Sequence, residues 1–160
     1  VLPDDNFSHV LEVGCGYGRL SPWISEYASD YVGIDINAEA LNMASNLHPN
    51  LSFQEDNIAE ITFDKNSFDL VVSNTVLHHI PPDVFQDAVS NLSRIITENG
   101  TFCMVGVTEG PGNDVTWIRS KNEYEDHFAK YGFTMKDTVE RDLPWRDSTE
   151  WVNTIMCFER

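Results

Sequence analysis

The sequence HVLEVGCGYGRL, residues 9–20, joins a short apolar segment to a cluster of three glycines. The apolar segment, 9–13, has the length of a buried strand, and apolar side chains then recur at helical spacing over 18–29. Glycines at such a turn let the backbone pass close to a ligand, and the helix after them offers free N–H groups. The pattern therefore predicts a parallel α/β sheet with a ligand site at the carboxyl end of its first strand.

Strands and helices continue to alternate after this turn. The last two expected strands, 133–141 and 151–159, are joined by residues 142–149, which are too few for a crossover helix, so these strands should be antiparallel. The predicted fold is a Rossmann-like, doubly wound, seven-stranded α/β sheet, mostly parallel with a C-terminal antiparallel hairpin. The other expected elements are strands over 31–35, 51–54, 68–73 and 101–107, and helices over 37–47, 81–97 (closed by Glu98-Asn99-Gly100) and 121–131.

Length and charge narrow the class of protein. The 160 residues suit a single domain, 1–160, and no apolar run approaches the ~20 residues that cross a bilayer. Ten Lys and Arg stand against 26 Asp and Glu, a net charge of −16. Without a basic cluster we expect neither a nucleic-acid partner nor binding to an anionic membrane. The acidity itself indicates either solubility or a salty habitat, or steering of a cationic substrate.

The spacing of the cysteines and histidines is informative about the cellular compartment and about metal binding. Cys15, Cys103 and Cys157 are odd in number and far apart, so we expect neither a disulfide framework nor a metal site, and a reducing, cytoplasmic location. The five histidines show no spacing typical of metal ligands, and we expect no metal.

The glycine cluster departs from the dinucleotide pattern. Its glycines run GxGxG, and Arg19 stands where a third fingerprint glycine would be. Glu12 at the strand end would repel a phosphate and suits a ligand with a positive end. Arg19 either neutralises a ligand carboxylate or is a solvated residue of the first turn.

Acidic residues also end the next two strands. Asp35 can accept both hydroxyls of a ribose, or serve as a charge at a helix N-terminus. Asp56 can accept from the amino group of adenine, or act as a turn residue. Ile36, beside Asp35, could lie against the purine ring.

Taken together, EVGCGYG, GID, EDNI and FDLVVSNTVLHHIPP resemble the successive motifs of class I S-adenosylmethionine-dependent methyltransferases of the small-molecule type, over residues 9–159. The resemblance implies S-adenosylmethionine as cofactor and S-adenosylhomocysteine as product. It implies that Asp35 binds the ribose and Asp56 the adenine amino group. It further implies that the methionine part is lined by Glu12, Gly14, Cys15, Gly16 and Gly18, that Ile36, Asn57 and Ile58 adjoin the adenine, and that Ser73 and Asn74 face the methionine and the transferring methyl.

The methyl acceptor is the open part of this interpretation. A small molecule with an amine, hydroxyl or carboxyl group is expected to receive the methyl by in-line displacement. His78 and His79 either take a proton from it or position the loop. Trp117, Trp145 and Trp151 either border a pocket or pack. The N-terminal lid is expected to be minimal or missing, and a homodimer is one way to cover the acceptor side. The alternatives are a protein or partner-dependent methyltransferase and a nucleotide-binding oxidoreductase.

Overall fold

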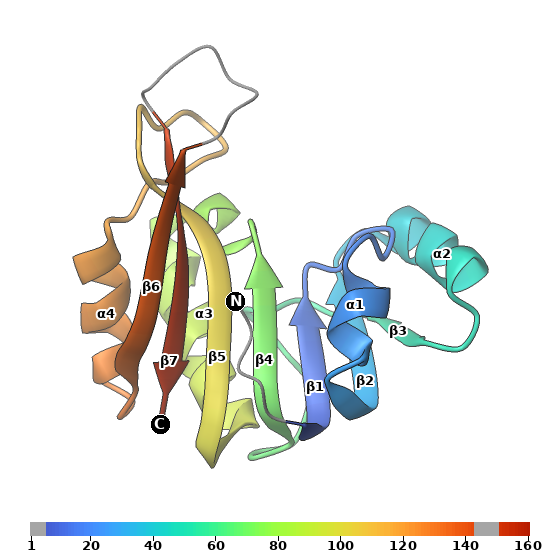
Figure 1. Cartoon of the computed structure of the whole chain (residues 1–160). Coiled ribbons are helices and arrows are strands. Elements are labelled where there is room, and N and C mark those ends of the chain that lie inside the picture. The colour runs from blue at the N-terminus through green and yellow to red at the C-terminus, as the bar shows by residue number, and fades with distance from the viewer. Residues whose placement is uncertain (1–5, 143–150) are drawn as a thin grey trace.

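The structure is a computed structural model of the chain and describes residues 6–142 and 151–160. The described residues form a seven-stranded sheet in the order β3-β2-β1-β4-β5-β7-β6 (Figure 1). Neighbours from β3 to β5 are parallel, whereas β7 is antiparallel to both β5 and β6. This confirms the predicted fold class. The strands are β1 (Phe7–Val13), β2 (Ala28–Asp35), β3 (Ser52–Glu55), β4 (Phe68–Asn74), β5 (Ile96–Glu109), β6 (Thr134–Asp142) and β7 (Val152–Glu159).

Four α-helices of the described residues flank the sheet: α1 (Ser21–Ser25), α2 (Ala38–Leu47), α3 (Pro82–Ile95) and α4 (Lys121–Ala129). In Figure 1, α3 and α4 cover one face of the sheet and α1 lies on the other. No helix among the described residues is long and apolar enough to span a membrane.

Local sequence signals fix where the helices begin. The Asn37 side chain accepts hydrogen bonds from the N–H groups of Glu39 and Ala40 and so caps α2. Pro82 is the first residue of α3, where its missing N–H costs nothing. These starts agree with the sequence-based expectation.

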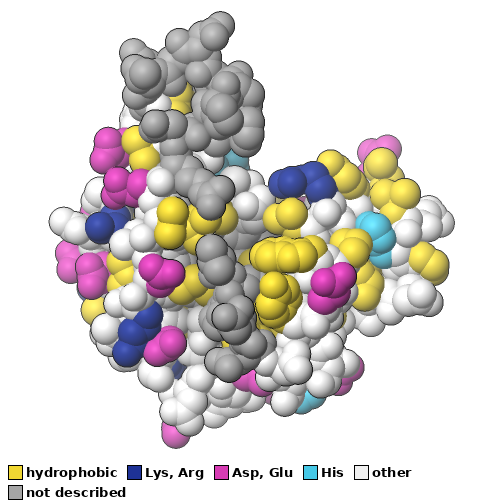
Figure 2. All heavy atoms as spheres, in the orientation of Figure 1, with side chains coloured by type: hydrophobic (Ala, Val, Ile, Leu, Met, Phe, Trp, Pro, Cys, Tyr) yellow, Lys and Arg dark blue, Asp and Glu magenta, His cyan; other side chains and the backbone are white. Residues whose placement is uncertain are grey.

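The face that carries α1 is partly apolar at its surface. Figure 2 shows hydrophobic side chains gathered over α1 and the strands beside it. Trp23 is 46% exposed and Tyr17 48% exposed. Trp23 packs edge-on against Tyr27, with ring centroids 5.5 Å apart, so this apolar surface is held in place by an aromatic pair.

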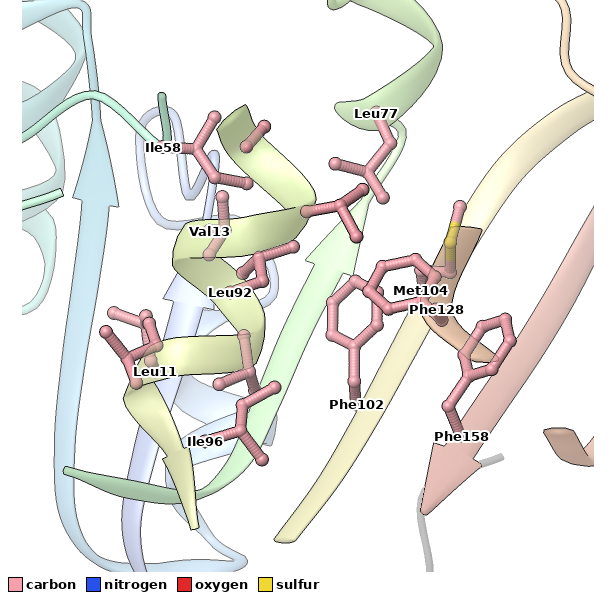
Figure 3. Packing of buried hydrophobic residues seen from close by; sticks show 14 of the residues in the cluster. Leu11, Val13, Ile58, Leu77, Leu92, Ile96, Phe102, Met104, Phe128 and Phe158 are labelled. Atoms are coloured by element: carbon pink, nitrogen blue, oxygen red, sulfur yellow. The ribbon is translucent and has the colours of Figure 1, made fainter. Parts of the chain in front are cut away.

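The main hydrophobic core lies between the sheet and the two helices α3 and α4 (Figure 3). Phe128 of α4 packs against Phe102 of β5 and Phe158 of β7, at centroid distances of 4.9 and 4.8 Å. Each of these buried rings contributes roughly 1.5–3 kcal/mol through apolar burial. Leu11 and Val13 of β1 belong to the same core, which therefore fixes the carboxyl end of β1, where the glycine loop begins.

Two predicted boundaries are wrong. The helix expected over 18–29 is only Ser21–Ser25, because the Tyr27 carbonyl already accepts from the Phe7 N–H (2.8 Å) and β2 begins at Ala28. Glu98-Asn99-Gly100 does not close a helix but lies inside β5. There the pairing with β4 jumps from Phe68↔Ile96 to Leu70↔Thr101, so the extra residues are accommodated as an irregularity of the strand.

The expectation that the cysteines form no disulfide is also wrong. Cys103 and Cys157 are 54 residues apart in sequence but are direct partners on the antiparallel strands β5 and β7, with Cα atoms 4.2 Å apart, and they form a disulfide. Sequence spacing does not reveal this proximity, because the register of β7 on β5 is a property of the whole sheet. The cysteine argument for a reducing compartment thereby loses its basis.

We expect the Cys103–Cys157 disulfide to contribute to stability. Reduction should lower the free energy of unfolding by roughly 2–4 kcal/mol, because the bond closes a long loop in the unfolded chain. Urea unfolding with and without a phosphine reductant measures this, and the Cys103→Ala variant, which cannot form the bond, should be insensitive to reductant. In the denatured, unreduced protein only Cys15 should react with a thiol reagent. Reaction of all the cysteines would contradict the disulfide.

Candidate cofactor site

The glycine loop between β1 and α1 has a backbone that only glycine adopts readily. Gly14, Gly16 and Gly18 have φ of +71°, +54° and +81°, in the left-handed region. The N–H groups of Gly14 and Cys15 both donate to the Ile34 carbonyl, at 2.8 and 3.0 Å, and tie the loop to the end of β2. The loop therefore curls over the carboxyl ends of β1 and β2.

Space as well as conformation requires glycine in this loop. A Cβ atom on Gly14 would lie 2.1 Å from Val76 Cγ2. A Cβ on Gly18 would meet His48 and Ala44 of the α2 region, so Gly18 packs against α2 and lines neither of the cavities described below. The Cys15 thiol is buried, and burial together with nearby Glu12 and Asp35 raises its pKa to about 12, so the thiol is unreactive.

Asp35, at the end of β2, holds the glycine loop and keeps acceptor capacity. Its Oδ2 accepts from the Gly16 N–H (2.8 Å) and its Oδ1 from the Asn37 N–H (2.9 Å). A carboxylate oxygen has two lone pairs, so each oxygen can still accept one hydrogen bond. The remaining capacity fits a ligand with two adjacent hydroxyl groups.

Asp35 borders a cavity of about 510 Å³ that lies over the carboxyl ends of β1, β2 and β4. Its volume is that of a small-molecule site. Apolar side chains make up more than half of its lining residues, and one of them, Ile36, is 72% exposed. The lining residues are Val13, Gly14, Ile34, Asp35, Ile36, Asp56, Asn57, Ile58, Ala59, Asn74, Thr75, Val76, His79, Ile80, Pro81 and Val84.

A smaller cavity of about 160 Å³ adjoins the first and shares Gly14, Asn74 and Thr75 with it. Glu12 and Arg19 both line it, so it holds one carboxylate and one guanidinium. This charge pair is complementary to the ammonium and carboxylate groups of an amino acid. Its lining residues are Glu12, Gly14, Cys15, Gly16, Tyr17, Arg19, Leu20, Asn74 and Thr75.

Glu12 is the most deeply buried charged group of this site, with 3% of its surface exposed. It accepts hydrogen bonds from the hydroxyl groups of Ser21 (2.6 Å) and Tyr31. Burial raises the pKa of Glu12, while these two hydrogen bonds and the nearby Arg19 oppose that rise. A cationic group beside Glu12 would further stabilise its ionised form.

In the segment after β3, part of the hydrogen-bonding capacity of the Asp56 carboxylate is taken by neighbouring residues. Asp56 accepts from the N–H and hydroxyl of Thr62, at 3.2 and 2.9 Å, and from the Asn57 N–H at 2.8 Å. Asp56 Oδ1 keeps one lone pair for a ligand amino group. Ile58 is buried and lines the larger cavity beside Asp56 and Asn57.

Ser73 and Asn74, at the end of β4, differ in whether they border the two cavities described above. Asn74 borders both cavities, whereas Ser73 borders neither. Ser73 is 1% exposed, and its hydroxyl finds no hydrogen-bond partner among the described residues. Ser73 instead lines, together with Asn74, a third cavity of about 200 Å³ beside α1.

The two histidines after β4 differ sharply. His78 is 4% exposed, and burial, with His79 and Arg119 nearby, lowers its pKa to about 4, so it is neutral and enclosed. His79 is exposed and lines the larger cavity. Its Nδ1 lies 2.7 Å from the Val115 carbonyl oxygen. Since a carbonyl can only accept, Nδ1 carries the hydrogen, and in the neutral ring Nε2 is then the nitrogen with the lone pair.

Sequence reasoning missed several residues of the site. Ser21 and Tyr31 reach Glu12 from separate elements, and no sequence motif marks them. Thr75 lines both cavities. Its φ is +61°, a backbone conformation that β-branched residues avoid and that occurs mainly at functional sites. Of the tryptophans, Trp117 borders a separate cavity beside α4, Trp151 lines none of the described cavities, and Trp145 lies outside the described residues.

This sheet order, with a glycine loop after β1 and an acid at the end of β2, defines the class I α/β fold that binds S-adenosylmethionine. The chain belongs to the methyltransferase-domain family, whose model matches residues 10–100. A solved S-adenosylmethionine-dependent methyltransferase from Methanosarcina mazei has the same fold, with a TM-score of 0.83, 16% identity and coverage of 99% of this chain and 94% of that one.

Curated relatives agree with this family but are longer. An uncharacterized methyltransferase of Synechocystis sp. is 27% identical over 108 residues, which are 68% of this chain and 50% of that protein. A ubiquinone biosynthesis O-methyltransferase of Coxiella burnetii is 29% identical over 96 residues, 58% of this chain and 40% of that protein. The matches span half or less of the length of these relatives.

The cofactor of this class is S-adenosylmethionine, and the two adjoining cavities fit it. The larger offers apolar side chains for adenine and the free lone pairs of Asp35 for the ribose diol. The smaller offers Glu12 and Arg19 for the two charges of the methionine end. No bridge of basic residues for a diphosphate lines either cavity among the described residues.

Proposed function

We propose that this chain is the catalytic domain of an S-adenosylmethionine-dependent methyltransferase that acts on a small-molecule acceptor, with residues 1–160 working as one cofactor-binding unit. The observation that carries the proposal is the paired lining of the smaller cavity by Glu12 and Arg19, next to the ribose-compatible Asp35. A zwitterionic amino acid joined to a nucleoside matches this arrangement.

The chain's own residues supply alignment. When bound, S-adenosylmethionine would supply an electrophilic methyl group on a sulfonium, for in-line transfer to the acceptor with a neutral thioether as the leaving group. Glu12, Asp35 and the glycine loop would hold the donor still, and such positioning contributes up to about 7–11 kcal/mol in favourable systems. No triad of catalytic groups is needed.

We assign His79 as the general base that takes the proton from the methyl acceptor. The Val115 carbonyl holds Nδ1, which leaves Nε2 as the proton acceptor of the neutral ring, and the side chain borders the cofactor cavity. An imidazole nitrogen with a free lone pair can accept a proton from a hydroxyl or amine acceptor. His78, buried and with a lowered pKa, would serve to position the loop.

The charge of the site favours a neutral or cationic acceptor. Glu12, Asp35 and Asp56 line the cavities, Arg19 is the basic side chain among their lining residues, and the whole chain carries −16. The name of the Coxiella relative includes O-methyltransferase, which supports an oxygen acceptor as one member of this class. The half-exposed Trp23 and Tyr17 are compatible with a partner subunit or a homodimer, and these, like a cytoplasmic location, stay predictions.

Titration calorimetry tests the proposed function. S-adenosylhomocysteine should bind with a dissociation constant of about 1–100 μM, equivalent to roughly 5–8 kcal/mol, and NADH should give no binding heat at the same concentrations. Binding of NADH without binding of S-adenosylhomocysteine would replace the methyltransferase by the oxidoreductase alternative.

A further inference from the structure

The Glu12 carboxylate is held from one side only. The hydroxyl groups of Ser21 and Tyr31 both donate to the same oxygen, Oε2. No described residue donates a hydrogen bond to Oε1, although Glu12 lines the smaller cavity. Ser21 belongs to α1 and Tyr31 to β2, so the two elements that follow the glycine loop converge on one carboxylate oxygen.

The sequence leaves room for the Tyr31 side chain. A Cβ atom on Gly33 would lie 2.7 Å from the Tyr31 hydroxyl oxygen and 3.0 Å from Cys15 Sγ. Residues 31 and 33 lie on the same face of β2, so only a glycine at position 33 lets the hydroxyl reach Glu12. The Tyr31 ring is further fixed by edge-on packing against Phe53, at 6.2 Å between centroids.

We propose that Tyr31 and Ser21 are positioning residues that hold Oε2 of Glu12 and thereby direct Oε1 toward the ammonium group of the cofactor. The proposal rests on the proposed function, because it takes the smaller cavity as the site of the methionine end. Two hydrogen bonds to one oxygen fix the rotation of the carboxyl group, and they also stabilise its ionised form.

The charges around Glu12 give this role a pH signature. Burial raises the pKa of Glu12 most, the Ser21 and Tyr31 hydroxyls lower it, Arg19 lowers it further, and Asp35 raises it. Cys15, the other titratable neighbour, stays a neutral thiol. Removing the Tyr31 hydroxyl therefore raises the pKa of Glu12, and the carboxyl group becomes neutral at a higher pH. Recognition of an ammonium group should weaken as the pH falls.

The experiment compares two ligands that differ at the amino-acid end. S-adenosylhomocysteine carries the ammonium group, while 5′-methylthioadenosine keeps the nucleoside and thioether and lacks it. In Tyr31→Phe we expect S-adenosylhomocysteine to bind about tenfold more weakly near pH 6 and about threefold more weakly near pH 8, with 5′-methylthioadenosine unchanged within about twofold. Ser21→Ala should show the same pattern, and it carries the test if Tyr31→Phe fails to fold by circular dichroism.

Tyr27→Phe is the matched control, because this tyrosine precedes the first residue of β2, at the end of the strand away from the cavities, and packs against Trp23. It should bind both ligands like the wild type. Equal weakening of both ligands in Tyr31→Phe and Ser21→Ala, or no weakening of either, would overturn the positioning role. If the wild-type protein itself binds neither ligand, the proposed function fails, which is a separate and recognisable outcome.

Discussion

Replacing Asp35 by alanine is expected to weaken S-adenosylhomocysteine binding at least about tenfold, because one charge-assisted contact to the ribose is worth roughly 1.5–3 kcal/mol. The change also removes the acceptor for the N–H groups of Gly16 and Asn37, so the glycine loop loses its side-chain tie to β2. Binding should therefore suffer both directly and through the loop. Titration calorimetry on the folded variant gives the dissociation constant.

Asp30→Ala is the control for this substitution. Asp30 lies on the same strand, its side chain is 81% exposed, and it pairs with His9 rather than with the site. The Asp30→Ala substitution removes the same charge and should leave the dissociation constant of S-adenosylhomocysteine within about twofold of the wild-type value. An unchanged constant in Asp35→Ala would show that the end of β2 does not hold the ribose.

Gly14→Ala is expected to damage both stability and binding. The new Cβ would lie 2.1 Å from Val76 Cγ2, at a backbone φ of +71° that alanine disfavours. The left-handed conformation costs about 1–2 kcal/mol and overpacking another 1–3 kcal/mol, so the free energy of unfolding should fall by roughly 2–5 kcal/mol. Val76 lines the larger cavity, so its displacement should weaken S-adenosylhomocysteine binding at least about tenfold.

Two variants separate the clash from the backbone cost. Gly132 has φ of +86°, and a Cβ atom there would meet no neighbour within 4 Å, so Gly132→Ala should lose only about 1–2 kcal/mol and bind ligand normally. The double variant Gly14→Ala, Val76→Ala removes the clashing methyl group and should recover part of the lost stability. Urea unfolding measures all three proteins. Equal losses in Gly14→Ala and Gly132→Ala would mean that Val76 does not pack against the loop.

Elements with local causes were predictable from the sequence. The strand-to-helix turns carry their own signals, such as Asn37 capping α2 and Pro82 opening α3. The α1 boundary was not predictable, because apolar residues at helical spacing compete there with pairing of β2 onto β1. The Cys103–Cys157 disulfide depends on the register between β5 and β7, a long-range property without a local signal.

The residues of the site also divide into those with a local sequence signal and those that depend on long-range contacts. The glycine loop and Asp35 can be located by their spacing, since each stands at the end of a recognisable strand. Tyr31 is interpreted from the sequence only as a strand residue, and its contact with Glu12 depends on the space that Gly33 leaves. Ser73 was expected beside Asn74 at the ligand, but it borders neither of the two cavities and lines a third one beside α1.

A crystal structure of the protein with S-adenosylhomocysteine tests the assignment of the two cavities most directly. We expect the ribose hydroxyl groups at about 2.6–3.2 Å from the Asp35 carboxylate, with the amino-acid end between Glu12 and Arg19. Density for the ligand elsewhere on the molecule, or with its amino-acid end turned away from Glu12, would contradict it.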